Sequence, residues 1–465
     1  MMILDIVPSG VQSLAPDEIN AMTDLLEIFS YYQPKNEEKD RYYEGKISLG
    51  SVNLGIALPK GMQGLEIGCS WGAKCVDVLA ARSMFDGFVG MNGEDVEAMD
   101  ELVRNNRLIF EYTKACRDEL KYGSCFATLS KDDQIGCKIR FHSPRTAAAR
   151  WDGNKNRIAY GMAVIASARN PADPTILQAV TTYLYMDDRI VVFRRDADQH
   201  WFAEHFQHKM GRPLMEPLVW NATSGKPFGR SRIKEPVRRL IQGYVRTIAN
   251  ATIGLEFATS PQKYLLGVTD DQYDKLINEN FRQYVGNILA STTNPDTGEK
   301  PTFGQLIQGN INPHVEMLRL LSTQFSAATG LPVTDSGVVN DANPTSSDAI
   351  LAQTQTLVSM AEELNAGNGD SLRTIALMAQ AIMDDSSMDD LSEEQKAIVA
   401  HFKNPAMPSV AVTADAAIKI ASARQGFAST DTFLEMIGFD QADIRRIKAQ
   451  EQRARGRAIL EELAI

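Results

Sequence analysis

Segment 65–72 of this 465-residue chain carries residue types that could hold a nucleoside-containing cofactor. It reads Leu-Glu-Ile-Gly-Cys-Ser-Trp-Gly, so Gly68 would follow a short strand and Gly72 would lie at the start of a helix. Glycines at such a turn let the backbone approach a cofactor, and an acidic residue about twenty positions later can hold the ribose. Asp86 follows Gly68 by 18 residues. These residues form the first candidate site.

The pattern resembles the first motif of methyltransferases that bind S-adenosylmethionine, and this enzyme class is one alternative function. Three observations oppose it. Ser70 replaces the middle glycine, and a proline and two glycines within 59–64 interrupt the strand that should come first. No alternation of strands and helices follows the motif, although a dinucleotide-type fold requires one. A helix over 71–85 with Trp71 packed inward accounts for the same residues.

Other motifs of catalysis are missing from the sequence. There is no Gly-x-x-x-x-Gly-Lys-Ser/Thr phosphate loop, no Gly-x-Ser-x-Gly turn and no His-Glu-x-x-His helix. His200, His205 and His208 lie close together, but the alternation of polar and apolar residues around them favours a strand. The five cysteines include no Cys-x-x-Cys pair and are predicted to be reduced. We predict no catalytic residue, no cofactor and no metal, and therefore no enzyme.

A cluster of arginines lies near the start of a long predicted helix. Its only acidic neighbour within 229–246 is Glu235, and its members are Arg230, Arg232, Arg238, Arg239 and Arg246. The whole chain has a net charge of −11 and a pI near 5.2. Tight nonspecific binding to DNA depends on an excess of lysine and arginine. We therefore favour ion pairing between subunits, and a soluble DNA-binding protein that uses 230–246 is a further alternative.

Hydrophobic periodicity predicts an α+β fold in which helices predominate. In the first half, helices are expected at 16–32, with Pro34 ending the first, and at 71–85, 94–104 and 108–122. From Ser124 the period changes to two, which predicts an antiparallel sheet. Its strands are expected at 125–129, 137–141, 159–166, 181–186, 190–194 and 201–206. No apolar run approaches the roughly 20 residues of a membrane helix.

The second half is expected to begin with a helix over 232–258, which would be about 40 Å long at about 1.5 Å per residue. An insertion over 260–312 should hold a strand at 264–266, a helix at 270–285 and two further strands. A return helix follows at 314–328. Two later helices, 344–365 and 371–383, are expected to be separated by Gly367-Asn368-Gly369. The acidic segment 384–394 is expected to be a solvated connector, and helices should follow at 414–424, 431–437 and onward to residue 465.

The order of these elements and several short motifs resemble the portal proteins of tailed bacteriophages, of the long-tailed siphophage type. The resemblance extends over roughly 25–463. It rests on Tyr42-Tyr43-Glu44-Gly45, on Trp71, Val76, Asp77, Arg82, Gly87 and Phe88, on residues 229–233 with Glu256, Pro261 and Gly267, and on 329–332, 343–350, 408–409 and 414–419. The tryptophan that usually precedes the C-terminal proline motif is absent, and residues 404–407 stand in its place.

The resemblance implies a portal fold with an α/β wing, a helical stem, a small α/β clip and a helical C-terminal crown. The implied boundaries are wing 1–228, stem helix 229–259, clip 260–312, second stem helix 313–332, tunnel loop 333–345, wing-associated helices 346–385 and crown 386–465. It implies that the tunnel loop faces a DNA channel, through Val338, Val339, Asn340, Asp341 and Asn343. The five arginines would then lie in the stem and between subunits.

The resemblance also implies a function and a set of partners. The chain would form a ring at one capsid vertex, usually of twelve copies, through which double-stranded DNA enters and leaves the capsid. It would dock the terminase large subunit, a head-tail adaptor, and the major capsid and scaffolding proteins. The virion is the expected location, after assembly in the host cytoplasm, and no membrane is involved.

Overall fold

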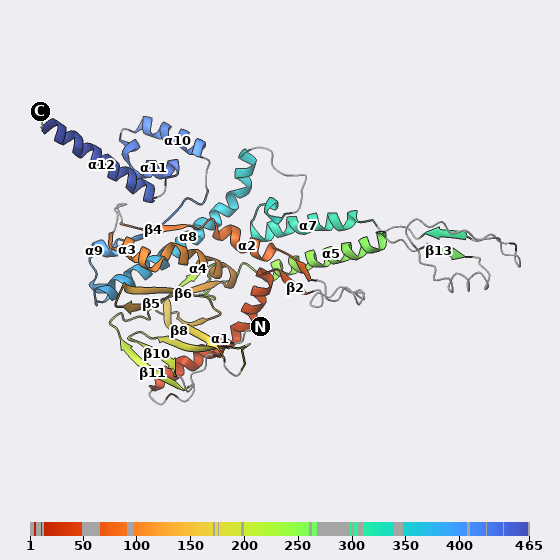
Figure 1. Ribbon diagram of the computed structural model, residues 1–465, viewed down its shortest axis with the longest axis horizontal. Helices are drawn as coiled ribbons and strands as arrows, with labels where there is room; N and C mark the ends of the chain where they lie inside the picture. Colours follow the sequence, from red (N-terminus) through yellow and green to blue (C-terminus); the bar gives the residue numbers. More distant parts are fainter. Residues whose placement is uncertain are drawn as a thin grey trace.

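Two β-sheets and the helices that cover them form the body of the protein, and a pair of helices projects from it (Figure 1). This computed structural model describes residues 4–5, 11, 14–48, 66–90, 97–170, 173–174, 176–196, 200–259, 263–266, 298, 302–305, 310–337, 347–406, 410–424, 426–439 and 441–463. The chain is α+β with helices predominating, as its periodicity predicts.

The larger sheet has the strand order β11-β10-β9-β8-β7, and β1 pairs in parallel with β9. Its strands are β1 (Leu4–Asp5), β7 (Ala147–Asp152), β8 (Arg157–Arg169), β9 (Leu177–Tyr185), β10 (Arg189–Arg195) and β11 (Trp201–Gln207). Successive side chains of a strand point to opposite faces. In β10, Val191 and Phe193 therefore pack with helix α1, whereas Ile190 and Val192 join the main core. The predicted strands of this sheet are present, and β1 and β7 are additional ones.

The smaller sheet has the order β12-β5-β6 and packs between the larger sheet and the helices. Its strands are β5 (Ser124–Asp132), β6 (Gly136–His142) and β12 (Met215–Val219). Helix α4 (Leu108–Tyr122) leads directly into β5. Gly123 ends this helix with φ of 110°, a left-handed conformation that glycine adopts at little cost. The predicted end of the helix is therefore confirmed.

Helix α1 spans Pro16–Tyr43 without interruption, so the predicted end of the helix at Pro34 is wrong. An interior proline costs about 3 kcal/mol in a helix. Contacts on both sides of it offset this cost. Residues before it, such as Leu25 and Phe29, are buried against the larger sheet, and the residues after it make ion pairs and hydrogen bonds with the body.

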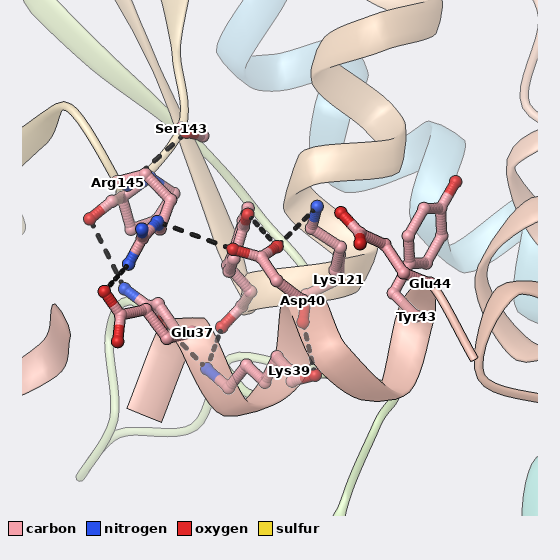
Figure 2. Close-up of polar contacts among 12 residues, drawn as sticks. Glu37, Lys39, Asp40, Tyr43, Glu44, Lys121, Ser143 and Arg145 are labelled. Carbon is pink, nitrogen blue, oxygen red and sulfur yellow. Dashed lines mark hydrogen bonds and ion pairs between the residues drawn. The ribbon is translucent and has the colours of Figure 1, made fainter. Parts of the chain in front are cut away.

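Figure 2 shows these polar contacts of the second half of α1. Asp40 pairs with Lys121 at 2.8 Å and with Arg145 at 3.4 Å, and Arg145 also pairs with Glu37 at 3.2 Å. The Lys39 ammonium donates a hydrogen bond to the Tyr122 carbonyl. Burial lowers the pKa of Lys39 to about 8. The network joins α1 to α4 and to the segment between β6 and β7.

Helix α2 (Trp71–Ala80) is shorter than predicted, because Phe85 belongs to strand β4 (Phe85–Val89). This strand pairs with β15 (Val399–Phe402), more than 300 residues later in the chain. Such distant pairing has no local sequence signal. Helix α3 (Glu97–Asn106) follows, and the short hairpin of β2 (Lys46–Ser48) and β3 (Glu66–Gly68) lies before α2.

Helix α8 (Ser347–Met383) is continuous, so the predicted break at Gly367-Asn368-Gly369 is wrong. Asn368 is fully buried. Its side-chain amide donates hydrogen bonds to the Tyr112 hydroxyl at 2.9 Å and to the Glu119 carboxyl at 2.8 Å. These two partners on α4 stabilise α8 at the segment where its sequence has the lowest helix propensity.

Helices α5 (Glu235–Thr259) and α7 (Asn312–Thr329) form the projecting pair, with the antiparallel strands β13 (Lys263–Leu266) and β14 (Thr302–Gln305) at its far end (Figure 1). The predicted helix 270–285 lies outside the described residues. After α8, the short turns η4 (Met388–Asp390) and α9 (Glu393–Lys396) occupy the acidic segment. The chain continues in α10 (Val410–Ala423), η5 (Phe427–Ser429), α11 (Asp431–Ile437) and α12 (Gln441–Leu463). Among the described helices, none is both long and apolar enough to cross a membrane.

Candidate functional site

The helix pair α5–α7 is the most distinctive feature of the molecule. With 25 residues, α5 extends roughly 38 Å at about 1.5 Å per residue. The two helices lie side by side along the projection (Figure 1). They approach closely at Gly243, where an added Cβ would lie 3.2 Å from the Leu321 side chain. A small residue at this point therefore allows the close packing of the pair.

Trp71 anchors the pair to the body. Its ring stacks on Phe325 of α7 at 4.7 Å between centroids and lies 4.9 Å from the ring of Tyr244 of α5. Its indole N–H donates to the Ser336 carbonyl at 2.9 Å, within the short turn η3 (Val333–Ser336). One buried side chain of α2 thus contacts both helices and the turn that follows them.

Arg232 lies just before α5 and is buried, with 7% of its surface exposed. Its guanidinium donates hydrogen bonds to the Cys75 carbonyl of α2 and, at 2.7 Å, to the Thr329 carbonyl at the end of α7. Burial lowers its pKa from the ordinary value. The hydrogen bonds of Arg232 in the described structure are thus all made inside its own chain.

Of the other arginines of the cluster, three are exposed and Arg238 is half-buried. Arg238 pairs with Glu235 at 2.5 Å and with Glu38 at 3.4 Å, and Arg239 pairs with Glu235 at 2.9 Å. Arg230 and Arg246 are exposed. Arg239 and Arg246 are seven residues apart and therefore share one side of α5. Surface ion pairs of this kind contribute about 0–1 kcal/mol, so they leave these side chains available to other partners.

Exposed apolar side chains also mark the projecting pair. Met317 and Leu320 of α7 are 43% and 52% exposed, and Leu255 of α5 is 45% exposed. Met317 and Leu320 are three residues apart and hence adjacent on the helix surface. Covering such exposed apolar side chains with another protein surface removes them from water and has a favourable free energy.

Comparison with known proteins identifies this architecture. Residues 23–457 match the family model described as "Phage portal protein, SPP1 Gp6-like". The chain belongs to this family of phage portal proteins. Among curated relatives, the portal protein of Mycobacterium phage D29 is 23% identical over 97% of this chain and 92% of its own length. The portal protein of Mycobacterium phage L5 is 25% identical over 80% of this chain and 76% of its own length.

Solved structures with a similar fold include one titled "Neck of empty GTA particle computed with C6 symmetry". It is 14% identical with a TM-score of 0.46, and the match covers 85% of this chain and 98% of that one. Another, "Neck of native GTA particle computed with C12 symmetry", is 12% identical with a TM-score of 0.45, over 79% and 89% of the two chains.

A portal protein is a structural component of the virion and not an enzyme, so the methyltransferase hypothesis is wrong. Gly72 of its motif serves packing. A Cβ on Gly72 would lie 1.9 Å from the Tyr42 carbonyl oxygen, because the start of α2 presses against the end of α1. The preceding strand β3 pairs only with β2, in antiparallel orientation, among the described residues.

Asp86, the proposed ribose ligand, instead lies 3.7 Å from Lys403 and 3.9 Å from His401. Both partners belong to the segment of β15, which pairs with the strand that carries Asp86. The alternative of a soluble DNA-binding protein is also set aside, since family membership accounts for the long helix that carries the arginines.

The five residues predicted to face the channel, Val338, Val339, Asn340, Asp341 and Asn343, lie outside the described residues. The segment that leads to them is described as far as Gly337. Gly330 ends α7 with φ of 71°, and a Cβ there would lie 2.8 Å from the Met360 side chain of α8. The chain therefore leaves α7 through a tight contact with α8, a constraint that the motif Thr-Gly-Leu-Pro had signalled.

Proposed function

We propose that copies of this portal protein form a closed ring at one vertex of the capsid, and that double-stranded DNA passes through its centre. The observation that carries the proposal is the projecting α5–α7 pair, whose apolar residues Met317, Leu320 and Leu255 are exposed in the single chain. Rings form when each subunit has two different complementary faces and the rotation closes. Helix pairs standing side by side would cover these side chains and enclose a channel.

In this proposal, residues 1–228 form the wing, with 346–385 packed on it, and α5 and α7 lie in the stem segments 229–259 and 313–332. Residues 260–312 form the clip, 333–345 the tunnel loop and 386–465 the crown. Val338, Val339, Asn340, Asp341 and Asn343 face the DNA. The net charge of −11 per chain supports sliding, because an acidic channel would disfavour adhesion of DNA phosphates.

The other four stem arginines, Arg230, Arg238, Arg239 and Arg246, are proposed to pair with acidic residues of the adjacent subunit. The assembled ring would dock the terminase large subunit during packaging and a head-tail adaptor afterwards. Its wing would contact the major capsid and scaffolding proteins. Assembly would take place in the host cytoplasm before the ring becomes part of the virion.

Native mass spectrometry of the purified full-length chain tests the ring. With 51.3 kDa per chain, twelve copies would give about 616 kDa, and electron microscopy should show an annular particle with an axial hole. A neighbouring ring number would still support the proposal. A monomer at every protein and salt concentration, or a closed particle without a hole, would show that it is wrong.

A further inference from the structure

Helix α12 carries a charge opposite in sign to that of the whole chain. Its segment 444–457 contains one acidic residue, Glu451, and six basic residues, which are Arg445, Arg446, Lys448, Arg453, Arg455 and Arg457. The segment therefore has a net charge of +5 in a chain whose net charge is −11. A local excess of arginine and lysine along one helix is typical of a surface that binds a polyanion.

Three of these arginines lie on one side of the helix. Ile444 is 1% exposed and marks the side of α12 that packs inside the protein. Arg453 follows it by nine residues, or two and a half turns, and therefore lies on the opposite side. Arg446 is seven residues before Arg453 and Arg457 is four residues after it, so both share its side. These three residues form an outward arginine stripe about 16 Å long at about 1.5 Å per residue.

The stripe is exposed and its guanidinium groups are not used inside the chain. Every residue from 451 to 457 is exposed, and the second half of α12 extends away from α10 and α11 (Figure 1). Among the described residues, none makes an ion pair with Arg446, Arg453 or Arg457. On the packed side, by contrast, Lys448 pairs with Asp431 of α11 at 2.5 Å. The stripe can therefore bind an external anion without first losing an internal partner.

The chemistry of the stripe favours phosphates. All its cations are arginines, whose planar guanidinium donates two parallel hydrogen bonds to a phosphate. One strand of duplex DNA carries a phosphate about every 3.4 Å along its axis, so a stripe of this length can reach several of them. Segment 451–457 contains no apolar side chain larger than alanine, whereas the centre of an interface between proteins is rich in apolar residues.

We propose that the arginine stripe of α12 binds the phosphate backbone of double-stranded DNA. The guanidinium groups donate to phosphate oxygens and read no base, so the contact is independent of sequence. The inference rests on the proposed function, because DNA is the molecule that the ring would conduct. It adds to the tunnel loop a second DNA contact, confined to one helix of an otherwise acidic chain.

Fluorescence anisotropy of a labelled duplex on the full-length chain, in about 50–200 mM salt, tests the contact. Arg446→Gln combined with Arg453→Gln should weaken binding about tenfold or more at the lowest salt. It should also reduce the slope of log affinity against log salt by about 2, because two phosphate contacts are lost.

Lys448→Gln combined with Arg455→Gln is the matched control. These two residues are also seven apart on α12, but they lie on the side of Ile444, so affinity should stay within about twofold of the unmodified chain. Equal losses in the two double variants, or no binding of the duplex by the unmodified chain, would overturn the proposal.

Two further measurements separate DNA from a protein partner. Polyglutamate should displace the duplex poorly, and displacement as efficient as by unlabelled duplex would overturn the choice of phosphates. Native mass spectrometry should show the same assembly in Arg446→Gln/Arg453→Gln as in the unmodified chain. A changed assembly with unchanged DNA binding would mean that a second copy covers the stripe. A ring that forms without binding the duplex would refute this contact alone, whereas a monomer that binds it through the stripe would refute the ring.

Discussion

Arg232 and Arg239 belong to the same arginine cluster, seven residues apart, but they lie in different environments. Arg232 is buried and donates to two backbone carbonyls of its own chain, whereas the side chain of Arg239 is 74% exposed and pairs only with Glu235 in the contacts described. The same contrast separates two regions of the helix pair. Its root, defined by Trp71, Arg232 and Phe325, is buried in the body, and its shaft, which is the exposed face of the two helices, carries Arg239 and Leu320.

The contrast indicates a division of tasks. At the root, aromatic stacking and hydrogen bonds to backbone carbonyls are complete within one chain, so these contacts stabilise the folded subunit. Along the shaft, apolar side chains stay in water and charged side chains make weak surface pairs. Substitutions at the root should therefore change the free energy of unfolding, and substitutions along the shaft should change assembly. The following predictions test this difference, beginning with the largest expected effect.

Trp71→Ala should cause the largest loss of stability. Removing a large buried aromatic side chain leaves a cavity and costs about 3–5 kcal/mol. Here it would also remove the stacking on Phe325 and the hydrogen bond to Ser336. Urea unfolding monitored by circular dichroism would measure the change. Tyr31→Ala, at a tyrosine that is 62% exposed, is the control and should cost less than about 0.5 kcal/mol. Equal losses in the two variants would contradict an anchoring role for Trp71.

Arg232→Met should cost about 2 kcal/mol, and Arg239→Met less than about 0.5 kcal/mol. Methionine is similar in length to the arginine stem, but it leaves the carbonyls of Cys75 and Thr329 without their donor. A buried unsatisfied carbonyl costs about 1–3 kcal/mol, from which the relief of a buried charge is subtracted. The same urea titration would compare the two variants. If both variants lost the same free energy of unfolding, burial of Arg232 would not contribute more to stability than the exposed Arg239.

Gly72→Ala should cost about 1–3 kcal/mol, because the new methyl group would overlap the Tyr42 carbonyl and force α1 and α2 apart. Gly68→Ala is its matched control. No atom lies within 4 Å of a Cβ built at Gly68, so stability should change by less than about 0.5 kcal/mol. Thermal unfolding of both variants would measure this. A larger loss in Gly68→Ala would show that close packing at Gly72 is not what the motif provides.

Glu119→Gln should remove a pH dependence of stability. Burial raises the pKa of Glu119 from its ordinary 4.5 to about 8 in the folded chain. Between these two pH values the folded state holds a proton that the unfolded state has lost, so stability falls as pH rises from about 4.5 to about 8. Glutamine cannot ionise, and for a shift of this size the variant should be up to about 4 kcal/mol more stable than the unmodified chain at pH 8.

The two proteins should differ little at pH 4.5, where the unmodified carboxyl is still protonated in the folded state. Urea titrations at both pH values would show the effect. A parallel offset at the two pH values would mean that the substitution acts by packing against Asn368 and not by ionisation.

Local signals predicted much of the fold. The ends of α4 and α7 follow from Gly123 and Gly330, and the length of α5 follows from its apolar period. The wrong predictions concern elements whose structure depends on contacts with residues distant in sequence. The Gly-Asn-Gly segment around Asn368 has low helix propensity, but α4 supplies buried partners that keep α8 continuous. Strand β7 contains three successive alanines with little strand preference and is fixed by pairing with β8.

The candidate site was less predictable than the fold. Sequence alone grouped Arg232 with its neighbours, because residue type and spacing do not reveal which side chain the tertiary structure buries. No local signal separated Arg232 from its neighbours, since the predicted helix 232–258 begins at this residue, whereas α5 begins at Glu235. Trp71 was expected to pack inward, but its partners Tyr244 and Phe325 lie about 170 and 250 residues later and could not be identified.

Along the shaft, Met317→Ser combined with Leu320→Ser should have the smallest effect on the single chain and a clear effect on assembly. Both side chains are about half exposed, so the free energy of unfolding should change by less than about 0.5 kcal/mol. If neighbouring subunits cover them, each serine removes apolar contact area at every interface of the ring, and the losses accumulate around it. Native mass spectrometry across a dilution series should then show assemblies that dissociate at higher protein concentration than the unmodified ones. Thr323→Ser, an exposed change on the same helix, is the control. Unchanged assembly in the double variant would place the subunit contacts elsewhere and leave the exposed residues of α7 to another partner.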